Sequence, residues 1–396
     1  MRQATTTPET QITLPAGRAT IRFDRNELAG AFGDMGTDVP LLIGMALAAG
    51  LDGTSTLVMF GVMQLLTGLI YRLPMPVQPL KAMAAIVIAR QASAATLYGA
   101  GLAIGLVMLV LAATGLLDWL ARVVPKCVVR GIQLGLGLQL ASVALGKFVQ
   151  ADGVSGYALA AFAFIVTILL LGNRRFPAAL PVVLLGLVYA MIFKWDGSLA
   201  RSFGFHLPGL RVPQPADILT GFLVLALPQI PLSLGNSVLA TWQLARDLFP
   251  DRRLTIRKIG LTYALMNLAN PWFGGVPTCH GSGGMAGHFA FGGRTGGSVI
   301  IYGLLFVLLG LFFGTGFDHV ATAFPLPILG VILLFEALAL IWLLRDTAPS
   351  RSEFPVALLV GLLAFGLPYG YVIGLVVGTV LFYLGGRTRL VSPDAV

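Results

Sequence analysis

Two segments, one in each half of the chain, place proline-rich backbone and polar side chains inside otherwise apolar sequence. They cover residues 74–84 (Pro-Met-Pro-Val-Gln-Pro-Leu-Lys-Ala-Met-Ala) and 277–286 (Pro-Thr-Cys-His-Gly-Ser-Gly-Gly-Met-Ala). In both, proline favours an extended entry, and the helix that follows is too short to cross a bilayer alone. Extended backbone inside a membrane is tolerated only where it is buried in protein or lines a cavity. The pattern therefore predicts two half-helices that meet near the membrane midplane.

Anion binding is the chemistry that such an arrangement offers. A helix N-terminus presents unpaired N–H groups and the positive end of the helix dipole, so two facing N-termini can bind an anion without a formal charge. Gln78 adds an amide donor on one side, and Thr278 and Ser282 add hydroxyl donors on the other. Three glycines would let backbone amides approach a ligand closely: Gly281, Gly283 and Gly284. The alternative is that these Gly and Pro residues only kink or pack helices.

Four ionisable side chains fall within apolar segments: Asp34, Asp38, Lys81 and Glu336. Such groups are costly in a bilayer and mark functional sites by default. Lys81, about one turn into its expected helix, can attract an anionic substrate or neutralise Asp34. Asp34 can carry a coupling proton or hold the neighbouring backbone. Asp38 has no evident partner and is expected near the membrane surface, and Glu336 is expected to serve packing or an interface.

The segment that opens the second half, residues 228–237, is polar but uncharged. Its Gln229, Asn236 and Ser237 suit hydrogen bonding to an oxyanion better than binding of a cation.

Three enzyme-like signals are weak. Cys279 and His280 are adjacent at a helix start, where side chains diverge, and no orienting acid accompanies them. The glycine-rich run from 281 to 287 follows no strand of a βαβ unit, which a dinucleotide site requires. Only His280 and His288 of the four histidines lie near each other, and no third metal ligand accompanies them. We therefore expect no enzyme activity, no cofactor and no metal site.

The elements that must position these residues are membrane helices. Of the 396 residues, 57% are hydrophobic and 11% are charged, against about 25% charged in an ordinary soluble domain. Apolar runs long enough to cross a bilayer recur throughout, most clearly at 97–117, 157–171, 178–193, 298–313 and 354–384. The last is long enough for two short spans broken near Pro368. The composition predicts a single all-α polytopic membrane protein, most consistent with a secondary transporter.

Fourteen segments are expected, beginning near residues 28, 54, 78, 97, 128, 157, 178, 218, 255, 280, 298, 327, 354 and 371. With the N-terminus inside, 20 of the 26 Lys and Arg residues fall on the cytoplasmic side, as the positive-inside rule requires. The net charge of +9 is therefore topological and implies no nucleic-acid partner. We expect a plasma (inner) membrane protein with both termini cytoplasmic, a disordered polar N-terminal tail and no cleavable signal peptide. The two cysteines imply no disulfide framework.

The two halves also resemble each other, since each contains an apolar segment that leads into a proline-bearing entry and a short helix. Seven segments per half is an odd number, so the second half must be inserted upside down relative to the first. This indicates an inverted repeat.

Four motifs together resemble the molybdate transporter family, a distant branch of the sulfate permease superfamily. They are Gly-Asp-Met-Gly-Thr at 33–37, Pro-Met-Pro-Val-Gln-Pro-Leu-Lys at 74–81, Leu-Gly-Asn-Ser at 234–237 and Pro-Thr-Cys-His-Gly-Ser-Gly-Gly at 277–284. Thr278 stands where the family pattern often has a second cysteine, so the resemblance supports no role for paired thiols.

The resemblance implies a seven-plus-seven inverted-repeat fold like that of the uracil permease. A cytoplasmic tail (1–27) would precede a mobile core made of residues 28–118 and 215–316. Residues 119–214 and 317–396 would form a gate or scaffold and a short tail. Molybdate would lie between the two half-helix N-termini, and dimerisation through the scaffold is the implied assembly.

The leading hypothesis is a tetrahedral oxyanion transporter, with molybdate first and sulfate or tungstate next. The site would be lined by Gln78, Thr278, Cys279, His280, Gly281, Ser282 and Gly283, with Thr37, Asn236 and Ser237 beside them. Lys81 would supply positive potential and Asp34 would serve coupling. The alternatives are a proton-coupled nucleobase permease of the same fold and an anion channel. The permease would need an acidic side chain at the second-half site, and none occurs between Asp217 and Asp247 or beside His280.

Overall fold

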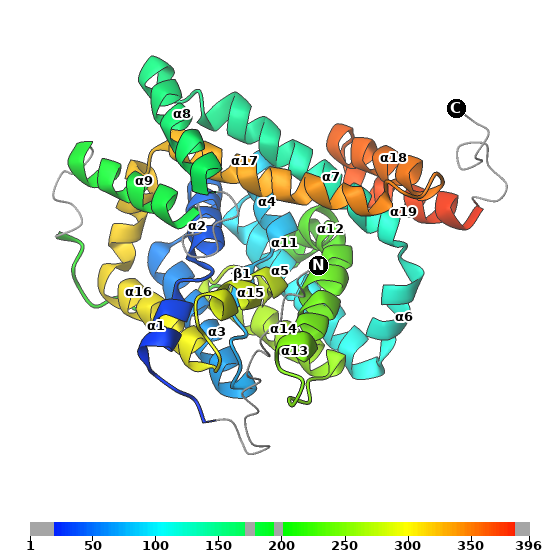
Figure 1. Cartoon of the computed structure of the whole chain (residues 1–396), viewed down its shortest axis with the longest axis horizontal. Coiled ribbons are helices and arrows are strands. Elements are labelled where there is room, and N and C mark those ends of the chain that lie inside the picture. The colour runs from blue at the N-terminus through cyan, green and yellow to red at the C-terminus, as the bar shows by residue number, and fades with distance from the viewer. Residues whose placement is uncertain (1–19, 171–178, 194–200, 385–396) are drawn as a thin grey trace, which may run out of the picture.

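Apolar helices make up most of the described chain, which comprises residues 20–170, 179–193 and 201–384 of a computed structural model (Figure 1). Residues 1–19 of the expected cytoplasmic tail (1–27) lie outside these ranges.

In the first half the elements are α1 (Arg25–Ala31), α2 (Met35–Ala49), α3 (Gly53–Tyr71), β1 (Val77–Pro79), α4 (Lys81–Arg90), α5 (Ala94–Thr114), α6 (Leu116–Val123), α7 (Lys126–Val143), the π-helical turn η1 (Ala144–Phe148), α8 (Gly153–Leu170) and α9 (Ala179–Phe193). In the second half they are α11 (Pro215–Gly221), η2 (Phe222–Ala226), α12 (Leu227–Leu232), η3 (Ser233–Ala240), α13 (Thr241–Leu248), α14 (Ile256–Ala269), η4 (Asn270–Phe273), β2 (Thr278–His280), α15 (Ser282–Ala290), α16 (Gly297–Ala323), α17 (Leu326–Trp342), η5 (Leu343–Thr347), α18 (Glu353–Gly366) and α19 (Gly370–Leu384).

The fourteen expected segments can be recognised among these elements. Within the described ranges, eight helices or series of consecutive helical elements are long and apolar enough to cross a membrane, and three shorter apolar helices accompany them. Helix α14 and the half-helices α4 and α15 bring the number to fourteen. The long apolar run 354–384 divides into α18 and α19 next to Pro368, as expected.

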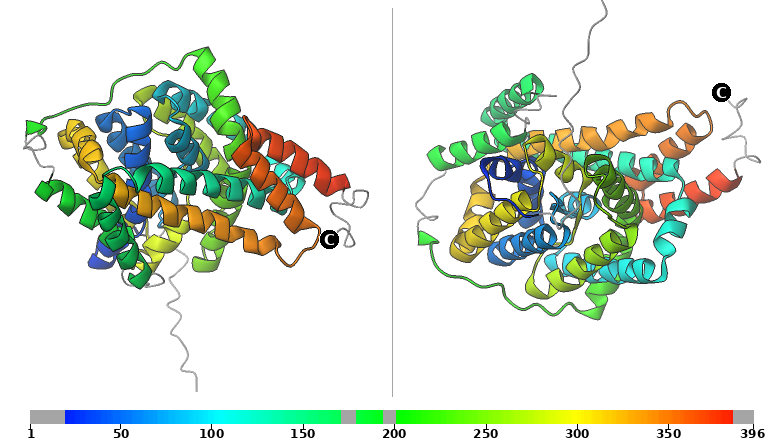
Figure 2. Two further views of the ribbon diagram at one scale, coloured as in Figure 1. Left: turned by 90° about the horizontal axis from the view of Figure 1, so that it is seen from above. Right: turned by 60° about the horizontal axis from the view of Figure 1, so that its bottom comes forward.

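Packing between the halves follows an inverted repeat. Helix α3, in the second segment of the first half, packs along α16, in the fourth segment of the second half. The equivalent pair with the halves exchanged, α14 with α5, also packs together. Helices α7, α17, α18 and α19 contact one another, and α8 and α9 contact α17. These six, α7–α9 and α17–α19, run across one side of the molecule and are called the outer group, while α1–α5 and α11–α16 form the inner group (Figures 1 and 2).

Small residues explain the closeness of α3 and α16. A Cβ added at Gly61 or Gly303 would overlap the backbone of the other helix, and so would one at Gly68 or Gly296. Glycine at these positions lets two apolar helices approach until their backbones touch, which is how membrane helices pack when lipid is as apolar as their side chains.

Strands β1 and β2 form a two-stranded antiparallel sheet, with Val77 opposite His280, Gln78 opposite Cys279 and Pro79 opposite Thr278. Because the strands run in opposite directions, α4 and α15 begin at this sheet and leave it in opposite directions. Two motifs some 200 residues apart are thereby brought into contact. The expected meeting of the two half-helices is confirmed.

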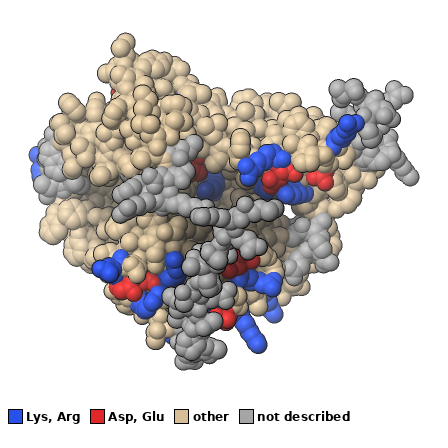
Figure 3. Space-filling model, viewed as in Figure 1, with Lys and Arg blue, Asp and Glu red and all other residues tan. Residues whose placement is uncertain are grey.

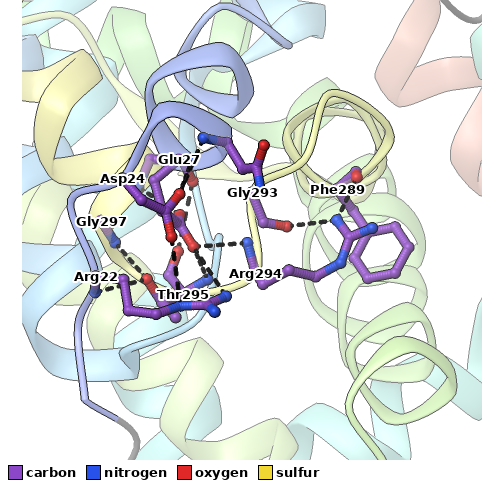
Figure 4. Close-up of polar contacts among 10 residues, drawn as sticks. Arg22, Asp24, Glu27, Phe289, Gly293, Arg294, Thr295 and Gly297 are labelled. Carbon is purple, nitrogen blue, oxygen red and sulfur yellow. Dashed lines mark hydrogen bonds and ion pairs between the residues drawn. The ribbon is translucent and has the colours of Figure 1, made fainter. Parts of the chain in front are cut away.

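The start of the first span is fastened to the loop before α16 through Glu27 (Figure 4). The buried Glu27 carboxylate accepts the backbone N–H groups of Arg294 (3.0 Å), Thr295 (2.8 Å) and Ser298 (2.9 Å). Asp24 caps α1 by accepting the N–H groups of Glu27 and Asn26, and the bond from Glu27 lowers the Asp24 pKa. We call this cluster the N-terminal clasp.

Charged side chains gather in a few patches, with wide uncharged surface between them (Figure 3). Large apolar side chains are exposed on that surface, including Leu169, Phe193 and Leu362, which are 76%, 69% and 61% accessible. Such exposure suits contact with lipid.

Candidate functional site

The candidate site surrounds the β1–β2 sheet and the first turns of α4 and α15. Gln78 lies on β1 and Lys81 is the first residue of α4. Thr278, Cys279 and His280 form β2, and Gly281, Ser282 and Gly283 lead into α15. The structure thus brings the predicted residues of both halves to one place.

Gln78 is joined to Asp34. Its Nε2 donates to both carboxylate oxygens, at 2.7 and 2.8 Å, and both residues are buried. Asp34 lies at the break between α1 and α2. This break packs on α15 so tightly that a Cβ at Gly33 would overlap the backbone of Gly287. Asp34 therefore reaches the start of α15 itself, where a Cβ at Gly284 would overlap its carboxylate.

Lys81 pairs with Glu336 and not with Asp34. The Lys81 Nζ lies 3.5 Å from Glu336 Oε2, and the Thr37 hydroxyl donates to Glu336 Oε1 at 3.4 Å. Glu336 was expected to serve packing or an interface, and α17 places its carboxylate at the contact between the outer group and Lys81 of the candidate site. Two opposite charges in separate apolar runs were the sequence signal for this pair.

Asp38 has a partner that the sequence argument did not find. It is fully buried and accepts a hydrogen bond from the Tyr302 hydroxyl at 3.2 Å. The partner could not be named from the sequence because it is 264 residues away, on α16.

The side chains of Thr278 and His280 make contacts of their own. The Thr278 hydroxyl accepts from Asn270 Nδ2 at 3.2 Å. His280 Nε2 lies 2.7 Å from the Thr262 hydroxyl, which is 2.5 Å from the hydroxyl of Tyr71. Alternate residues of a strand point to opposite faces. Cys279 is therefore the β2 side chain on the face of its partner Gln78, and β2 contacts η3, which carries Ser237.

The remaining predicted residues lie around this centre. Thr37 contacts Glu336, and Ser237 is buried on η3, which packs against β2. Asn236 instead lines a cavity of about 280 Å³ between η3 and α7, together with Lys126 and Arg130. Among the described residues, no three His, Cys, Asp or Glu side chains converge as metal ligands would.

The two half-helix starts differ in one respect. Gln229 Oε1 accepts the N–H groups of Ala82 (2.9 Å) and Met83 (3.3 Å), so the first turn of α4 is already capped. In the described chain, no side chain accepts from the first amides of α15. Within 4 Å of a Cβ at Gly283 there is only open space. The α15 start lies next to Gln78, because a Cβ at Gly281 would overlap the Gln78 side chain. A helix start whose first amides donate to no side chain can bind an anion.

Comparison with known proteins identifies the family. The family model described as "Molybdate transporter of MFS superfamily" matches residues 26–140 and 221–340, which include both strands, both half-helices and Glu336. The chain belongs to the molybdate transporter family. Arabidopsis thaliana molybdate transporter 2 is 36% identical over 83% of this chain and 81% of its own length. Molybdate transporter 1 of the same plant is 32% identical over 90% and 87%.

Solved structures show the fold of this molybdate transporter family member. The transmembrane domain of a cyanobacterial bicarbonate transporter, BicA, superposes with a TM-score of 0.64 at 18% identity, covering 87% of this chain and 97% of that domain. The murine Solute Carrier 26 family member A9 anion transporter superposes with a TM-score of 0.68 at 13% identity, covering 93% of this chain and 69% of its own. The seven-plus-seven inverted-repeat fold expected from the sequence is confirmed.

Proposed function

We propose that this protein is a secondary active transporter of a tetrahedral oxyanion, with molybdate as the first candidate. The observation that carries the proposal is the uncapped start of α15 beside Gln78, with Lys81 at the start of α4 at the other end of the β1–β2 pairing. Backbone N–H groups at a helix start, a lysine and a side-chain amide are donors suited to an oxyanion. The names of the plant relatives support molybdate.

Movement of the anion would use the two helix groups. The expected mobile core, residues 28–118 and 215–316, holds most of the inner group, and the expected gate or scaffold, residues 119–214 and 317–396, holds the outer group. The Lys81–Glu336 pair joins the two groups. A dianion that reaches Lys81 competes with the single charge of Glu336, and binding thereby loosens the contact between core and gate.

Asp34 would couple this step to a proton. In the present arrangement the Gln78 amide is held by the Asp34 carboxylate. A carboxylate accepts hydrogen bonds more strongly than its neutral acid does. Protonation of Asp34 would therefore release the Gln78 amide for the oxyanion and remove a negative charge from its neighbourhood.

The protein would lie in the plasma (inner) membrane with both termini cytoplasmic, as the distribution of Lys and Arg favours. Dimerisation through the outer group is the assembly that we propose with it.

The first test is calorimetric titration of the detergent-purified protein with molybdate, with sulfate and uracil as competitors. Tight molybdate binding that sulfate barely displaces supports the assignment. A response to sulfate alone would support the same anion site with sulfate as its substrate. A response to uracil alone would favour the nucleobase alternative, for which Asp34 supplies an acidic group at the start of α15. Flux measured in proteoliposomes separates a transporter from a channel.

A further inference from the structure

Two carboxamide side chains that no sequence motif singled out hold the β1–β2 sheet from its outer edges. Gln64 of α3 accepts the Val77 N–H at 2.8 Å and donates to the Val77 carbonyl at 2.6 Å. Asn267 of α14 accepts the Thr278 N–H at 2.9 Å and donates to the Thr278 carbonyl at 2.6 Å. Both side chains are fully buried.

The physical need for these bonds follows from the size of the sheet. Each strand has three residues and a single neighbour, so its outer edge has N–H and C=O groups with no strand partner. Inside a membrane protein, such groups must find partners within the protein. A primary amide carries one acceptor and one donor in the geometry of a peptide group. Gln64 and Asn267 therefore each act as a one-residue strand that completes the sheet.

The two contacts are equivalent under the inverted repeat. Val77 and Thr278 are the first residues of their strands, and α3 and α14 belong to the second segments of their halves. Helix α3, which carries Gln64, packs on α16, and helix α14, which carries Asn267, packs on α5. These are the two helix pairs that are equivalent under the inverted repeat. We call each amide contact a clamp. The clamped residue, Val77 or Thr278, lies four residues before the first residue of a half-helix, Lys81 or Ser282.

We propose that Gln64 and Asn267 are positioning residues, which set the separation of the two half-helix starts and thereby the affinity and size selectivity of the site without touching the ligand. The inference rests on the proposed function, since the ligand is the oxyanion bound there. Each amide fixes its strand to a neighbouring helix at two points, so a shorter or longer side chain moves the strand and the half-helix start that follows it. A purely structural role predicts loss of stability with unchanged binding in the folded fraction.

The experiment compares conservative and disruptive changes at both clamps. Gln64→Asn and Asn267→Gln keep the amide but change its reach, whereas Gln64→Met keeps the size and removes both bonds. Gln133→Met is the matched control, because Gln133 is an equally buried glutamine on α7, away from the sheet. For each monodisperse variant, melting temperature and Kd for molybdate and sulfate are measured by titration.

We expect Gln64→Met to weaken molybdate binding about tenfold or more, the size of one lost interaction of about 1.4 kcal/mol. Gln64→Asn and Asn267→Gln should change the ratio of the molybdate and sulfate Kd values severalfold, and Gln133→Met should leave it unchanged. The conservative variants keep the test decisive if Gln64→Met does not fold. Lower melting temperatures with wild-type Kd values at both clamps would overturn the inference.

The wild-type titration separates this result from the proposed function. Wild-type protein that binds neither oxyanion rejects the proposed substrate class. The clamp variants are then titrated with whichever of bicarbonate or uracil the wild type binds, and unchanged affinity would still overturn the positioning role.

Discussion

The glycines at the start of α15 differ sharply in the space around them. A side chain at Gly281 would overlap the Gln78 amide, and one at Gly284 would overlap Asp34, whereas Gly283 faces open space. Sequence alone treated the three as equivalent donors of backbone amides. The structure divides them into two that permit close packing of the two halves and one that faces the region where we place the anion.

This division predicts the outcome of three alanine substitutions. Gly281→Ala and Gly284→Ala should lower molybdate affinity by about tenfold or more, because Gln78 and Asp34 must move to admit the methyl group. Gly283→Ala is the control and should keep the fold. Titration and melting temperature check both statements, and equal effects at the three positions would contradict the packing argument.

The Asp34–Gln78 contact predicts a pH-dependent step. If Asp34 carries the coupling proton, uptake into proteoliposomes should rise as the external pH falls, because protonation frees the Gln78 amide and removes a charge. Asp34→Asn, which cannot ionise, should flatten this dependence. Two other buried or half-buried carboxylates lie nearby, so Asp38→Asn and Glu336→Gln are the controls. An unchanged pH profile in Asp34→Asn would remove the coupling role.

Among the elements, α4 and α17 are joined by the ion pair that the sequence argument did not foresee. Lys81 and Glu336 belong to helices of different groups, so their contact must change if the groups move relative to each other. This makes the pair more informative than a contact within one group.

Glu336→Gln should tighten molybdate binding severalfold, because Lys81 loses its competing partner, and should alter turnover. Lys81→Met should weaken binding, and the double variant should bind like Lys81→Met, because Glu336→Gln has no effect once Lys81 is absent. Titration of the four proteins gives this cycle directly. Additive effects would show that Glu336 acts on the anion by repulsion alone and not through Lys81.

The N-terminal clasp is a second contact between distant elements, since Glu27 of α1 holds the backbone at the start of α16. Glu27→Ala leaves three backbone N–H groups without their acceptor and should cost about 3 kcal/mol, seen as a clear fall in melting temperature. Asp24→Ala, which removes only the exposed cap of α1, should cause a smaller fall. Equal falls would show that Glu27 contributes no more than a cap.

For the whole molecule, composition and periodicity were enough for the class, the fourteen segments and the inverted repeat. Lipid imposes continuous apolar helices, and these are visible in a single sequence. The sequence marked Lys81, Glu336 and Asp38 as unusual charges in apolar runs, but it did not pair Lys81 with Glu336 or Asp38 with Tyr302, because the partners are more than 250 residues apart. Gln64 and Asn267 carried no signal, since a buried amide in an apolar run does not reveal which backbone group it contacts.

Topology can be tested on the intact protein, because both native cysteines are buried. Gly209 is expected on the outer side of the membrane and Ala348 on the inner side, and both residues are exposed. Gly209→Cys and Ala348→Cys therefore each place one accessible thiol on a known side of the expected topology. A membrane-impermeant maleimide applied to whole cells should label the first and not the second until the membrane is opened. The reverse pattern would invert the orientation that we propose.

The β1–β2 pairing also constrains how the protein is made. Val77 leaves the ribosome roughly 200 residues before its partner His280. At about 5–20 residues per second, the first half waits on the order of ten to forty seconds in the bilayer. During that interval Gln64 can already bind the outer edge of β1 at Val77. The backbone groups of β1 that will pair with β2 have no strand partner until the second half is made. The first half is thus a long-lived insertion intermediate, and a chaperone or the insertion machinery has that interval in which to shield the unfinished sheet.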